Sequence, residues 1–419
     1  MKILIKKVYV IDIQSEHHHQ TVDILIDNGI IVSIAKNIVN SNIDSEIDIP
    51  NLHVSQGWFD SSVCFGEPGF EERETIANGL NVAARSGFTA VCVQPNSNPV
   101  IDNQAQIQFL KSKSAGFATD LYPIGAFTKN SDGKDMAELF DMKNAGAVAF
   151  GDYNKNIDNS NLVKIGLQYL QDFDGLLIAF CENKHIKANG IVNESATTIH
   201  FGLKTNPSLA EEMELARNLF LLEYAGGRLH IPTISTAKSL ALIRAAKAKG
   251  LHVTCSVAVH HLILTDSCLE TFDTCFKTTP PFRSLSDCKA LIDGILDGTI
   301  DIITSDHNPI DIDHKNLEFE MAKNGTIGLE SAFGALMNVL PIDVIVEKLT
   351  ASKSVFGVPN FTIAEKQKAN LTFFSPTEQY TFGEKHIFSK SKNSAFIGMK
   401  VGGKVHGIFN NSQLILNNI

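Results

Sequence analysis

Residues 228–257 read RLHIPTISTAKSLALIRAAKAKGLHVTCSV, in which an apolar run, a helical stretch and a second apolar run follow one another. Short apolar runs of this kind predict buried strands, and the stretch between them predicts a helix. Further apolar runs on both sides read TAVCVQP, AVAFGD, GLLIAFC and IDIITSD, and helical stretches such as SLAEEMELARNLFLLEYAGG and SLSDCKALIDGILDG lie between runs. This alternation over residues 52–361 predicts a closed (β/α)8 TIM barrel, in which chemistry sits at the carboxyl ends of the strands.

The two ends of the chain have a different pattern. ILIKKVYVI and VDILIDNGIIVSI, with a turn at Asp27-Asn28-Gly29, resemble hairpin-linked strands, and strands return in ANLTFFSP and IGMKVGGKVHGIFN. We therefore expect residues 1–51 and 362–419 to form one small composite β domain, a β-sandwich, beside the barrel.

Three consecutive histidines, His17, His18 and His19, lie between the first two predicted strands. A histidine tract in a loop can bind metal adventitiously. We interpret the tract instead as a solvated hairpin tip, because no acidic or cysteine partner flanks it.

Composition excludes several classes of protein. The 419 residues are 44% hydrophobic and 20% charged, as in an ordinary globular protein, and the net charge of -10 argues against non-specific nucleic-acid binding. The seven cysteines include no CxxC pair, so neither a disulfide scaffold nor a zinc ribbon is indicated. We find no signal-peptide pattern and no apolar run of membrane-spanning length, and we expect a cytoplasmic protein without membrane association.

Several segments along most of the chain form a recognisable series. They are, in order, Glu67-Pro68-Gly69, GLNVAARSGFTAV, Pro95-Asn96, PSLAEEMELAR, His260-His261-Leu262, Pro280-Pro281-Phe282-Arg283, Ser305-Asp306-His307-Asn308-Pro309, Gly328-Leu329-Glu330 and SKSKNSAFIGMKVGGKV. In this order they resemble dihydroorotases, which are cyclic amidohydrolases of pyrimidine biosynthesis. The resemblance implies a metal-dependent amidohydrolase barrel that closes and opens the dihydroorotate ring with the help of zinc.

The resemblance also implies four metal-binding histidines, and this chain has none of them. The two positions of the family's HxH pair are Ser62 and Cys64, and the two later histidine positions are Phe180 and Thr233. Alternation along the first strand places Ser62 and Cys64 on the same face, and a serine hydroxyl is a poor zinc ligand beside imidazole. We therefore expect no bound metal and no cofactor.

Three of the family's functional positions keep their residue type. Asp152 stands at the position of the bridging acid, Asp306 at that of the general base and Asn96 at that of a substrate-binding asparagine. Two further substrate anchors, an arginine and a histidine, are replaced by Gly66 and Ile310. The retained residues also have structural interpretations. Asp306 would accept hydrogen bonds from Thr304 or Ser305, and Asn96 would cap a strand-to-helix turn.

A rebuilt metal site would have to use Cys64, Asp152 and Asp306, which would consume the base as a ligand. Cys181 and His230 lie an odd number of residues from the expected ligand positions and hence on the opposite strand face. We expect His260 and His261, at a strand end, to be core residues with one satisfied ring nitrogen each.

Three functions remain open. The first is a non-catalytic dihydroorotase-like subunit, which by analogy with such proteins would be a structural or regulatory partner of aspartate transcarbamoylase. The second is an active dihydroorotase or related cyclic amidohydrolase that cleaves a cyclic amide C–N bond with an atypical zinc site. The third is a small-molecule binding protein that uses the altered barrel pocket. A homo-oligomer is compatible with each of them, since barrels of this type commonly dimerise.

Overall fold

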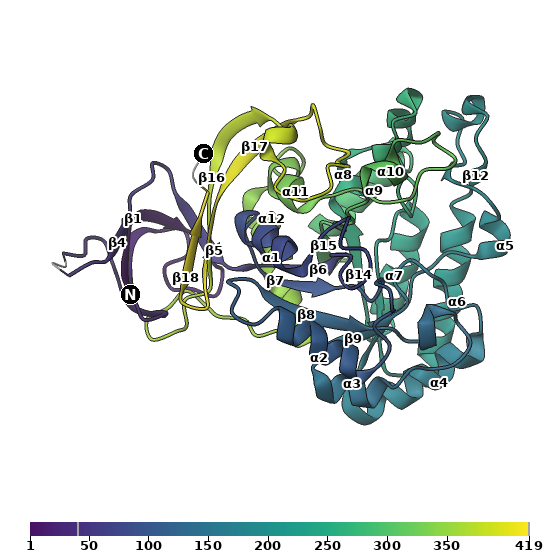
Figure 1. The fold of residues 1–419 in the computed structure, drawn as a ribbon, viewed down its shortest axis with the longest axis horizontal. Coiled ribbons are helices and arrows are strands. Elements are labelled where there is room, and N and C mark those ends of the chain that lie inside the picture. Colours follow the sequence, from purple (N-terminus) through teal and green to yellow (C-terminus); the bar gives the residue numbers. More distant parts are fainter. Residues whose placement is uncertain (40–41, 418–419) are drawn as a thin grey trace.

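The structure, a computed structural model, describes residues 1–39 and 42–417 and contains two large β-sheets. In the described chain, eight parallel strands form the first sheet, in the order β15-β14-β13-β10-β9-β8-β7-β6 (Figure 1). Their bounds are β6 Trp58–Val63, β7 Phe88–Val93, β8 Asp120–Gly125, β9 Ala149–Gly151, β10 Leu176–Ile178, β13 Arg228–Ile231, β14 Val253–Ala258 and β15 Ile302–Thr304.

The first and last of these strands meet and close the barrel. Val63 forms a parallel bridge with His307, and the backbone N–H of Cys64 donates to the carbonyl of His307 over 2.8 Å. One buried cluster contains residues from most of these strands, and its members include Phe59, Cys92, Ile124, Ile178 and Ile302. The predicted eightfold barrel is therefore confirmed.

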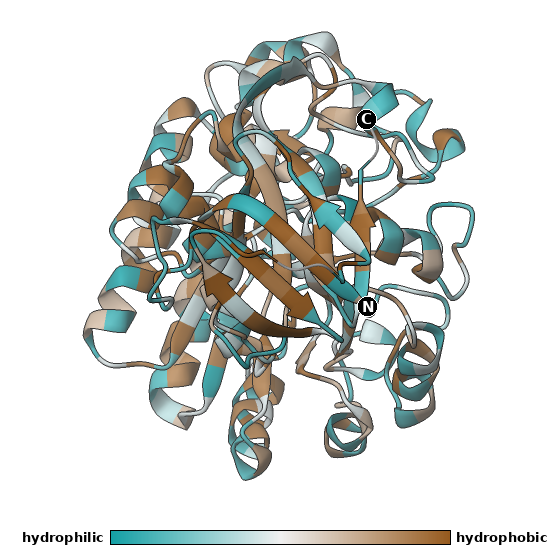
Figure 2. Cartoon of the chain, turned by 90° about the vertical axis from the view of Figure 1, so that its left-hand side faces the viewer, coloured by the Kyte–Doolittle hydropathy of each residue, from teal (hydrophilic) through white to brown (hydrophobic). Residues whose placement is uncertain are grey.

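Helices follow the strands and surround the barrel. Local sequence starts them as expected: Thr236 accepts a hydrogen bond from the Ser239 N–H at the start of α7, and Ser284 and Asp287 form a capping box at the start of α9. The helices are α1 Ile76–Arg85, α2 Gln104–Lys113, α3 Leu139–Ala145, α4 Ser160–Leu170, α5 Lys184–Lys187, α6 Leu209–Ala225, α7 Ala237–Ala248, α8 Val259–Ile263, α9 Leu285–Leu296, α10 Ile312–Lys315, α11 Leu329–Leu336 and α12 Ile342–Thr350. Figure 2 shows helices that alternate between hydrophobic and hydrophilic residues, as expected for elements that pack one face on a barrel.

Both chain ends form the second sheet, which is mixed (Figure 1). Its order is β18-β17-β16-β5-β1-β2-β3, with β4 paired to β1. The bounds are β1 Lys2–Val10, β2 Thr21–Asp27, β3 Ile30–Ala35, β4 Ser45–Ile47, β5 His53–Gln56, β16 Leu371–Thr381, β17 Lys400–Asn410 and β18 Gln413–Leu416. The predicted contribution of both ends to one β unit is confirmed, and its strands are hydrogen-bonded into a single sheet. Residues 40, 41, 418 and 419 of the predicted small domain lie outside the described residues.

A short excursion separates β10 from β13 and carries the paired strands β11 Val192–Asn193 and β12 Thr205–Asn206. Arg283, which is fully buried, donates to the Asn193 side chain over 3.0 Å and to the Asn206 carbonyl over 2.9 Å. It therefore fixes this excursion to the barrel. None of the described helices has the length and apolar character that a membrane crossing requires.

Candidate functional site

The candidate site lies where β6 and β15 end, at the mouth of the barrel. Ser62 and Asp306 face each other there because the barrel closes between these strands. The Ser62 hydroxyl donates to Oδ1 of Asp306 over 3.1 Å and accepts a hydrogen bond from Nε2 of Gln94, also over 3.1 Å. Both residues are buried. The serine at a predicted metal-ligand position is thus bonded to the aspartate at the predicted general-base position.

The expected partners of Asp306 belong to a different carboxylate. Thr304 donates through its hydroxyl to Oδ1 of Asp60, and the Ser305 N–H donates to Oδ2 of Asp60 over 2.9 Å. The prediction that these residues would satisfy Asp306 is therefore wrong. Asp60, which the sequence reasoning missed, ties the middle of β6 to the end of β15. A carboxylate inside the otherwise apolar start of a buried strand was the signal for it.

Burial dominates the electrostatics of Asp306. Removal from water raises the pKa of its carboxyl group to about 7, the hydrogen bond from Ser62 opposes this rise, and the charge of Asp60 adds to it. Asp306 also has a φ of 47°, in the left-handed region that non-glycine residues seldom adopt. The carboxyl group therefore exchanges its proton near neutral pH and is held in a strained backbone position.

Cys64 is a protonated thiol at neutral pH. Burial raises its pKa to about 12, and the charge of Asp306 contributes, whereas the neighbouring side chains of Tyr153 and Asn96 act in the opposite direction. Cys64 thus shares the mouth with Asp306 and Asn96. Zinc binds the thiolate form of cysteine, so this thiol would have to give up a strongly held proton to become a ligand.

Asp152 is tied to a different loop. Its Oδ1 accepts from the Thr128 N–H over 3.0 Å, and its Oδ2 accepts from the Thr128 hydroxyl over 2.5 Å. Burial raises the pKa of Asp152 while these bonds oppose the rise. Each oxygen at the bridging-acid position therefore already accepts one hydrogen bond from Thr128.

The two later histidine positions carry no ligand for zinc. Phe180 and Thr233 are both buried, and Thr233 has a φ of 46°, which is unusual for a β-branched residue. Strand alternation predicts that the two neighbouring donors lie on the opposite strand face. The prediction holds for Cys181, which packs towards α6, and is wrong for His230, whose ring lies inside the barrel, 5.5 Å from that of Phe356 in the buried cluster of inward-facing strand residues. Cys181 accepts a hydrogen bond from Asn218 on α6, and the ring nitrogens of His230 lie 2.9 Å from the Thr254 hydroxyl and 3.1 Å from the Ser256 hydroxyl.

The two positions where the resemblance implies substrate-binding side chains, Gly66 and Ile310, also lack a polar side chain. Gly66 has a φ of 75°, and a Cβ atom at this position would lie 2.5 Å from the carbonyl oxygen of Phe70. The loop therefore has no room for an arginine without rearrangement. Ile310 is buried. A cation that the sequence reasoning missed lies near Cys64: Arg73, whose Nε is 3.5 Å from Oδ2 of Asp311, slightly lowers the pKa of the thiol.

These residues do not fit a catalytic zinc ion. Among residues 1–39 and 42–417, the one group of three His, Cys, Asp or Glu side chains with ligand atoms within 4.8 Å of one another excludes Cys64, Asp152 and Asp306. An open catalytic zinc site needs three such ligands in fixed geometry. The serine hydroxyl and the protonated thiol are poor ligands, and Asp152, whose two oxygens each accept a bond from Thr128, does not form a group of three with them.

His260 and His261 agree only in part with their expected setting. They lie in α8, which begins directly at the end of β14, both are buried, and their ring centroids are 4.4 Å apart. His261 contacts the Pro280 carbonyl over 3.2 Å. Neither ring nitrogen of His260 has a hydrogen-bond partner within the described chain. The expectation of one satisfied nitrogen holds for His261 and is wrong for His260.

Solved structures with the same architecture include hydantoinases. L-hydantoinase (dihydropyrimidinase) from Arthrobacter aurescens matches with a TM-score of 0.86 at 21% identity, covering 99% of this chain and 96% of that one. A D-hydantoinase matches with a TM-score of 0.83 at 19% identity, covering 100% of this chain and 96% of that one. At these identities the likeness defines the fold, an amidohydrolase-type barrel with a sheet from both chain ends.

Sequence comparison identifies the family within that fold. A family model described as dihydro-orotase-like matches residues 53–239. Proteins named dihydroorotase from Ruminiclostridium cellulolyticum and Pelotomaculum thermopropionicum are each 38% identical, with 96% of this chain and 96% of each relative aligned. The chain belongs to the dihydroorotase family.

Proposed function

We propose that this protein is a dihydroorotase-family member of pyrimidine biosynthesis that does not hydrolyse cyclic amides. The observation that carries the proposal is the hydrogen bond from Ser62 to Asp306, 3.1 Å long, at the mouth of the barrel. It links a position where the family resemblance implies a metal-binding histidine to the position where it implies the general base. The Ser62 hydroxyl is bonded on both sides, to Asp306 and Gln94, without a metal ion.

The loss of catalytic rate expected without a metal ion supports the same proposal. Water bound to zinc has a pKa of about 7, compared with about 15.7 in bulk, so a site without metal has almost no hydroxide nucleophile at neutral pH. General base catalysis contributes only about 10²–10⁴-fold, which is far too little to replace that activation. Asp306, although its pKa of about 7 suits a base, therefore cannot sustain the reaction alone.

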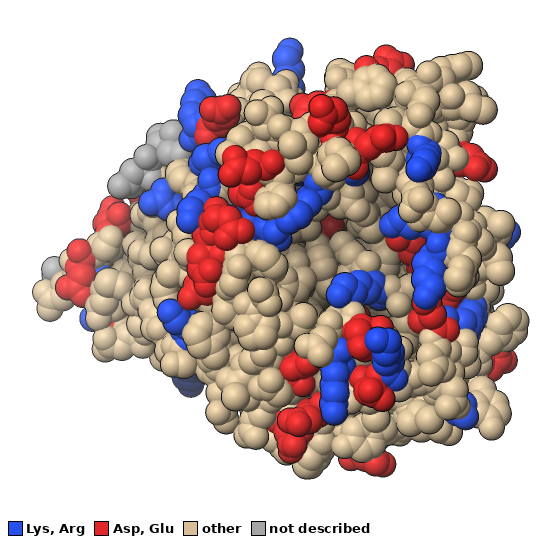
Figure 3. All heavy atoms as spheres, turned by 45° about the vertical axis from the view of Figure 1, so that its right-hand side comes forward, with Lys and Arg blue, Asp and Glu red and all other residues tan. Residues whose placement is uncertain are grey.

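Specific observations favour a second candidate, an active cyclic amidohydrolase with an atypical metal site. The curated relatives are named dihydroorotase and align over nearly the whole chain. Asp306 has a pKa suited to proton transfer near neutral pH, and Arg73 brings a positive charge towards the mouth, where an anionic ring would bind. Figure 3 shows a hollow near the centre of one face, with acidic and basic side chains interspersed around it.

An activity assay separates the two candidates. Purified protein supplemented with zinc would be assayed for dihydroorotate ring opening and ring closure beside an Asp306→Ala variant, with a histidine-containing family member as the positive control. We expect no turnover above that of the variant. Turnover in the wild type that the substitution abolishes would overturn the non-catalytic proposal and establish the second candidate.

A folded barrel without a competent site is suited to a scaffolding role, and we propose aspartate transcarbamoylase as its partner, by analogy with other non-catalytic dihydroorotase-like subunits. Co-purification of the two proteins from the same cells, followed by measurement of the complex mass in solution, tests this role. We expect a defined complex and a transcarbamoylase that loses thermal stability without this chain. Normal assembly and stability of the transcarbamoylase alone would contradict it.

A further inference from the structure

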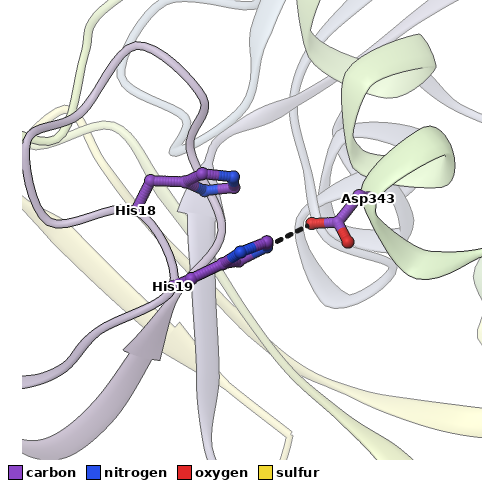
Figure 4. A group of neighbouring side chains, drawn as sticks. All are labelled: His18, His19 and Asp343. Atoms are coloured by element: carbon purple, nitrogen blue, oxygen red, sulfur yellow. Dashed lines mark hydrogen bonds and ion pairs between the residues drawn. The ribbon is translucent and has the colours of Figure 1, made fainter.

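The histidine tract of the N-terminal hairpin has an acidic neighbour that the sequence concealed. His18 and His19 lie in the loop between β1 and β2, and Asp343 lies in the first turn of α12 (Figure 4). Nε2 of His19 is 2.8 Å from Oδ1 of Asp343, although the two residues are 324 positions apart in the sequence. The tract lies at a hairpin tip with His19 exposed and His17 and His18 partly exposed, as interpreted, but the premise that it has no acidic partner is wrong.

The backbone and neighbouring rings hold His19 in place before any ligand binds. His19 has a φ of 60°, and its N–H donates to the Val10 carbonyl over 2.8 Å. Its ring stacks on that of His18, with centroids 3.8 Å apart, and lies 5.9 Å from the ring of Tyr9. A left-handed non-glycine residue is costly, and such positions concentrate at functional sites.

We propose that His18, His19 and Asp343 bind a divalent transition-metal ion of the zinc type. The proposal is independent of the function assigned to the barrel mouth. Two imidazoles and one carboxylate form a donor set that suits Zn²⁺, with a fourth position left for water. These three residues are the group in the described chain whose ligand atoms all lie within 4.8 Å of one another.

The geometry needs only a small adjustment. Bonds of about 2.0–2.1 Å in a tetrahedral site place ligand atoms roughly 3.4 Å apart, so the side chains must move by about 1 Å. The side chains of His19 and Asp343 are about half exposed, so a shift of this size would not disturb the core. A cavity of about 90 Å³ beside the cluster is lined by His18, Asp343 and, one helical turn along, Glu347, which offers a second carboxylate.

The ring of His18 sets a limit on the affinity. Its Nδ1 accepts a hydrogen bond from the Asp12 N–H over 3.1 Å, so Nε2 carries the proton in the metal-free protein. Coordination through Nε2 requires the other tautomer and the loss of this bond. The bound ion would connect the loop of the small sheet to α12 of the barrel, so its binding should also stabilise the contact between the two.

Zinc titration of tag-free protein by calorimetry, after exhaustive chelation, tests the inference. The wild type should bind one equivalent of zinc. The Asp343→Asn variant and the His18→Ala/His19→Ala double variant should bind at least about tenfold more weakly, since even the loss of a residue that supports a ligand costs that much. His17→Ala is the matched control. It removes a histidine of the same tract that is not part of the cluster, so this variant should bind zinc like the wild type.

A spectrum of the cobalt-loaded wild type adds a readout of coordination, and circular dichroism checks that each variant is folded. Equal binding by the wild type and Asp343→Asn would overturn the inference, since the tract alone would then suffice. The absence of saturable binding by the wild type would also overturn it. One equivalent retained by the double histidine variant would place the ion elsewhere and would instead support the active candidate at the barrel mouth.

Discussion

The hydroxyl of Ser62 donates a hydrogen bond to Oδ1 of Asp306 across the seam where the first and last strands close the barrel. In a barrel that binds zinc at this mouth, both positions would be directed at the metal and its water. Here they are directed at each other, and Asp60 beneath them takes the hydrogen bonds of Thr304 and Ser305. The seam is therefore a hydrogen-bonded polar network that links the two strands that close the barrel.

Replacement of Asp306 by asparagine should change how stability depends on pH. The pKa of Asp306 is raised from 3.8 to about 7, so its contribution to stability is fully present below about pH 4 and is lost as pH rises through about 7. At 1.36 kcal/mol per pKa unit, this loss amounts to at most about 4 kcal/mol. The Asp306→Asn variant has no carboxyl group to titrate and therefore avoids this loss. The free energy of unfolding of the wild type should fall relative to that of the variant as pH rises.

Urea unfolding of both proteins at several pH values measures this difference. Ser62→Ala is the matched comparison. It removes the hydrogen bond that lowers the pKa of Asp306, so it should extend the loss of stability to higher pH. Parallel pH profiles for the wild type and Asp306→Asn would contradict the raised pKa.

Removal of the Asp60 carboxylate should be strongly destabilising. Asp60→Ala leaves three donors without their acceptor, namely the Thr304 hydroxyl and the N–H groups of Ser62 and Ser305. Each buried unsatisfied group costs about 1–3 kcal/mol, so the free energy of unfolding should fall by at least about 3 kcal/mol. Thr304→Val removes one of these bonds and the acceptor of the Asp306 N–H, and it should cost less than Asp60→Ala, about 1–2 kcal/mol, in denaturant titrations. Equal losses in the two variants would argue against Asp60 as the centre of the network.

Cys64 should resist alkylation in the folded protein. Its pKa of about 12 leaves a thiolate fraction of about 10⁻⁴ at pH 8, and the side chain is buried. Iodoacetamide labelling followed by mass spectrometry should modify the half-buried Cys268 first and Cys64 only after unfolding. Labelling of Cys64 at the rate of Cys268 would show an accessible thiolate and would strengthen the case for a metal ligand at the mouth.

The two adjacent histidines of α8 should respond differently to substitution. His260→Leu removes two ring nitrogens that have no partner among the described residues, so the free energy of unfolding should stay equal or rise. His261→Leu loses the contact with the Pro280 carbonyl and should cost about 1 kcal/mol. Thermal or denaturant unfolding measures both. A larger loss for His260→Leu would reveal a bound partner for its ring.

Local patterns were sufficient to predict most of the fold. Residues 228–257 contain β13, α7 and β14 where apolar runs and a helical stretch predicted them, and Asn28 and Gly29 adopt positive φ angles in the predicted turn. The strand β8 was not identified, because Pro123 interrupts its apolar pattern and proline usually marks an edge or a break. Pairing with the neighbouring strands β7 and β9 makes this segment a strand, and that pairing is not visible in the local sequence.

The sequence predicted where the residues of the candidate site lie, but not which of them form hydrogen bonds with one another. The spacing of the family motifs located Ser62, Cys64 and Asp306 correctly at strand ends. Which carboxylate would accept the hydrogen bonds of Thr304 depended on the stagger between β6 and β15, and a single sequence does not reveal that stagger. The pairing of His19 with Asp343 was hidden for a similar reason, since it depends on how the small sheet packs on α12.

The sheet that joins both chain ends also affects how the protein is made. β5 pairs on one side with β1 and on the other with β16, which begins only at Leu371. On the ribosome, where the N-terminus emerges first, β1 to β4 can pair with one another early, but β5 must wait without its second partner until the whole barrel has been translated. A chain released early would keep an open β edge, the kind of surface that nascent-chain chaperones protect from aggregation.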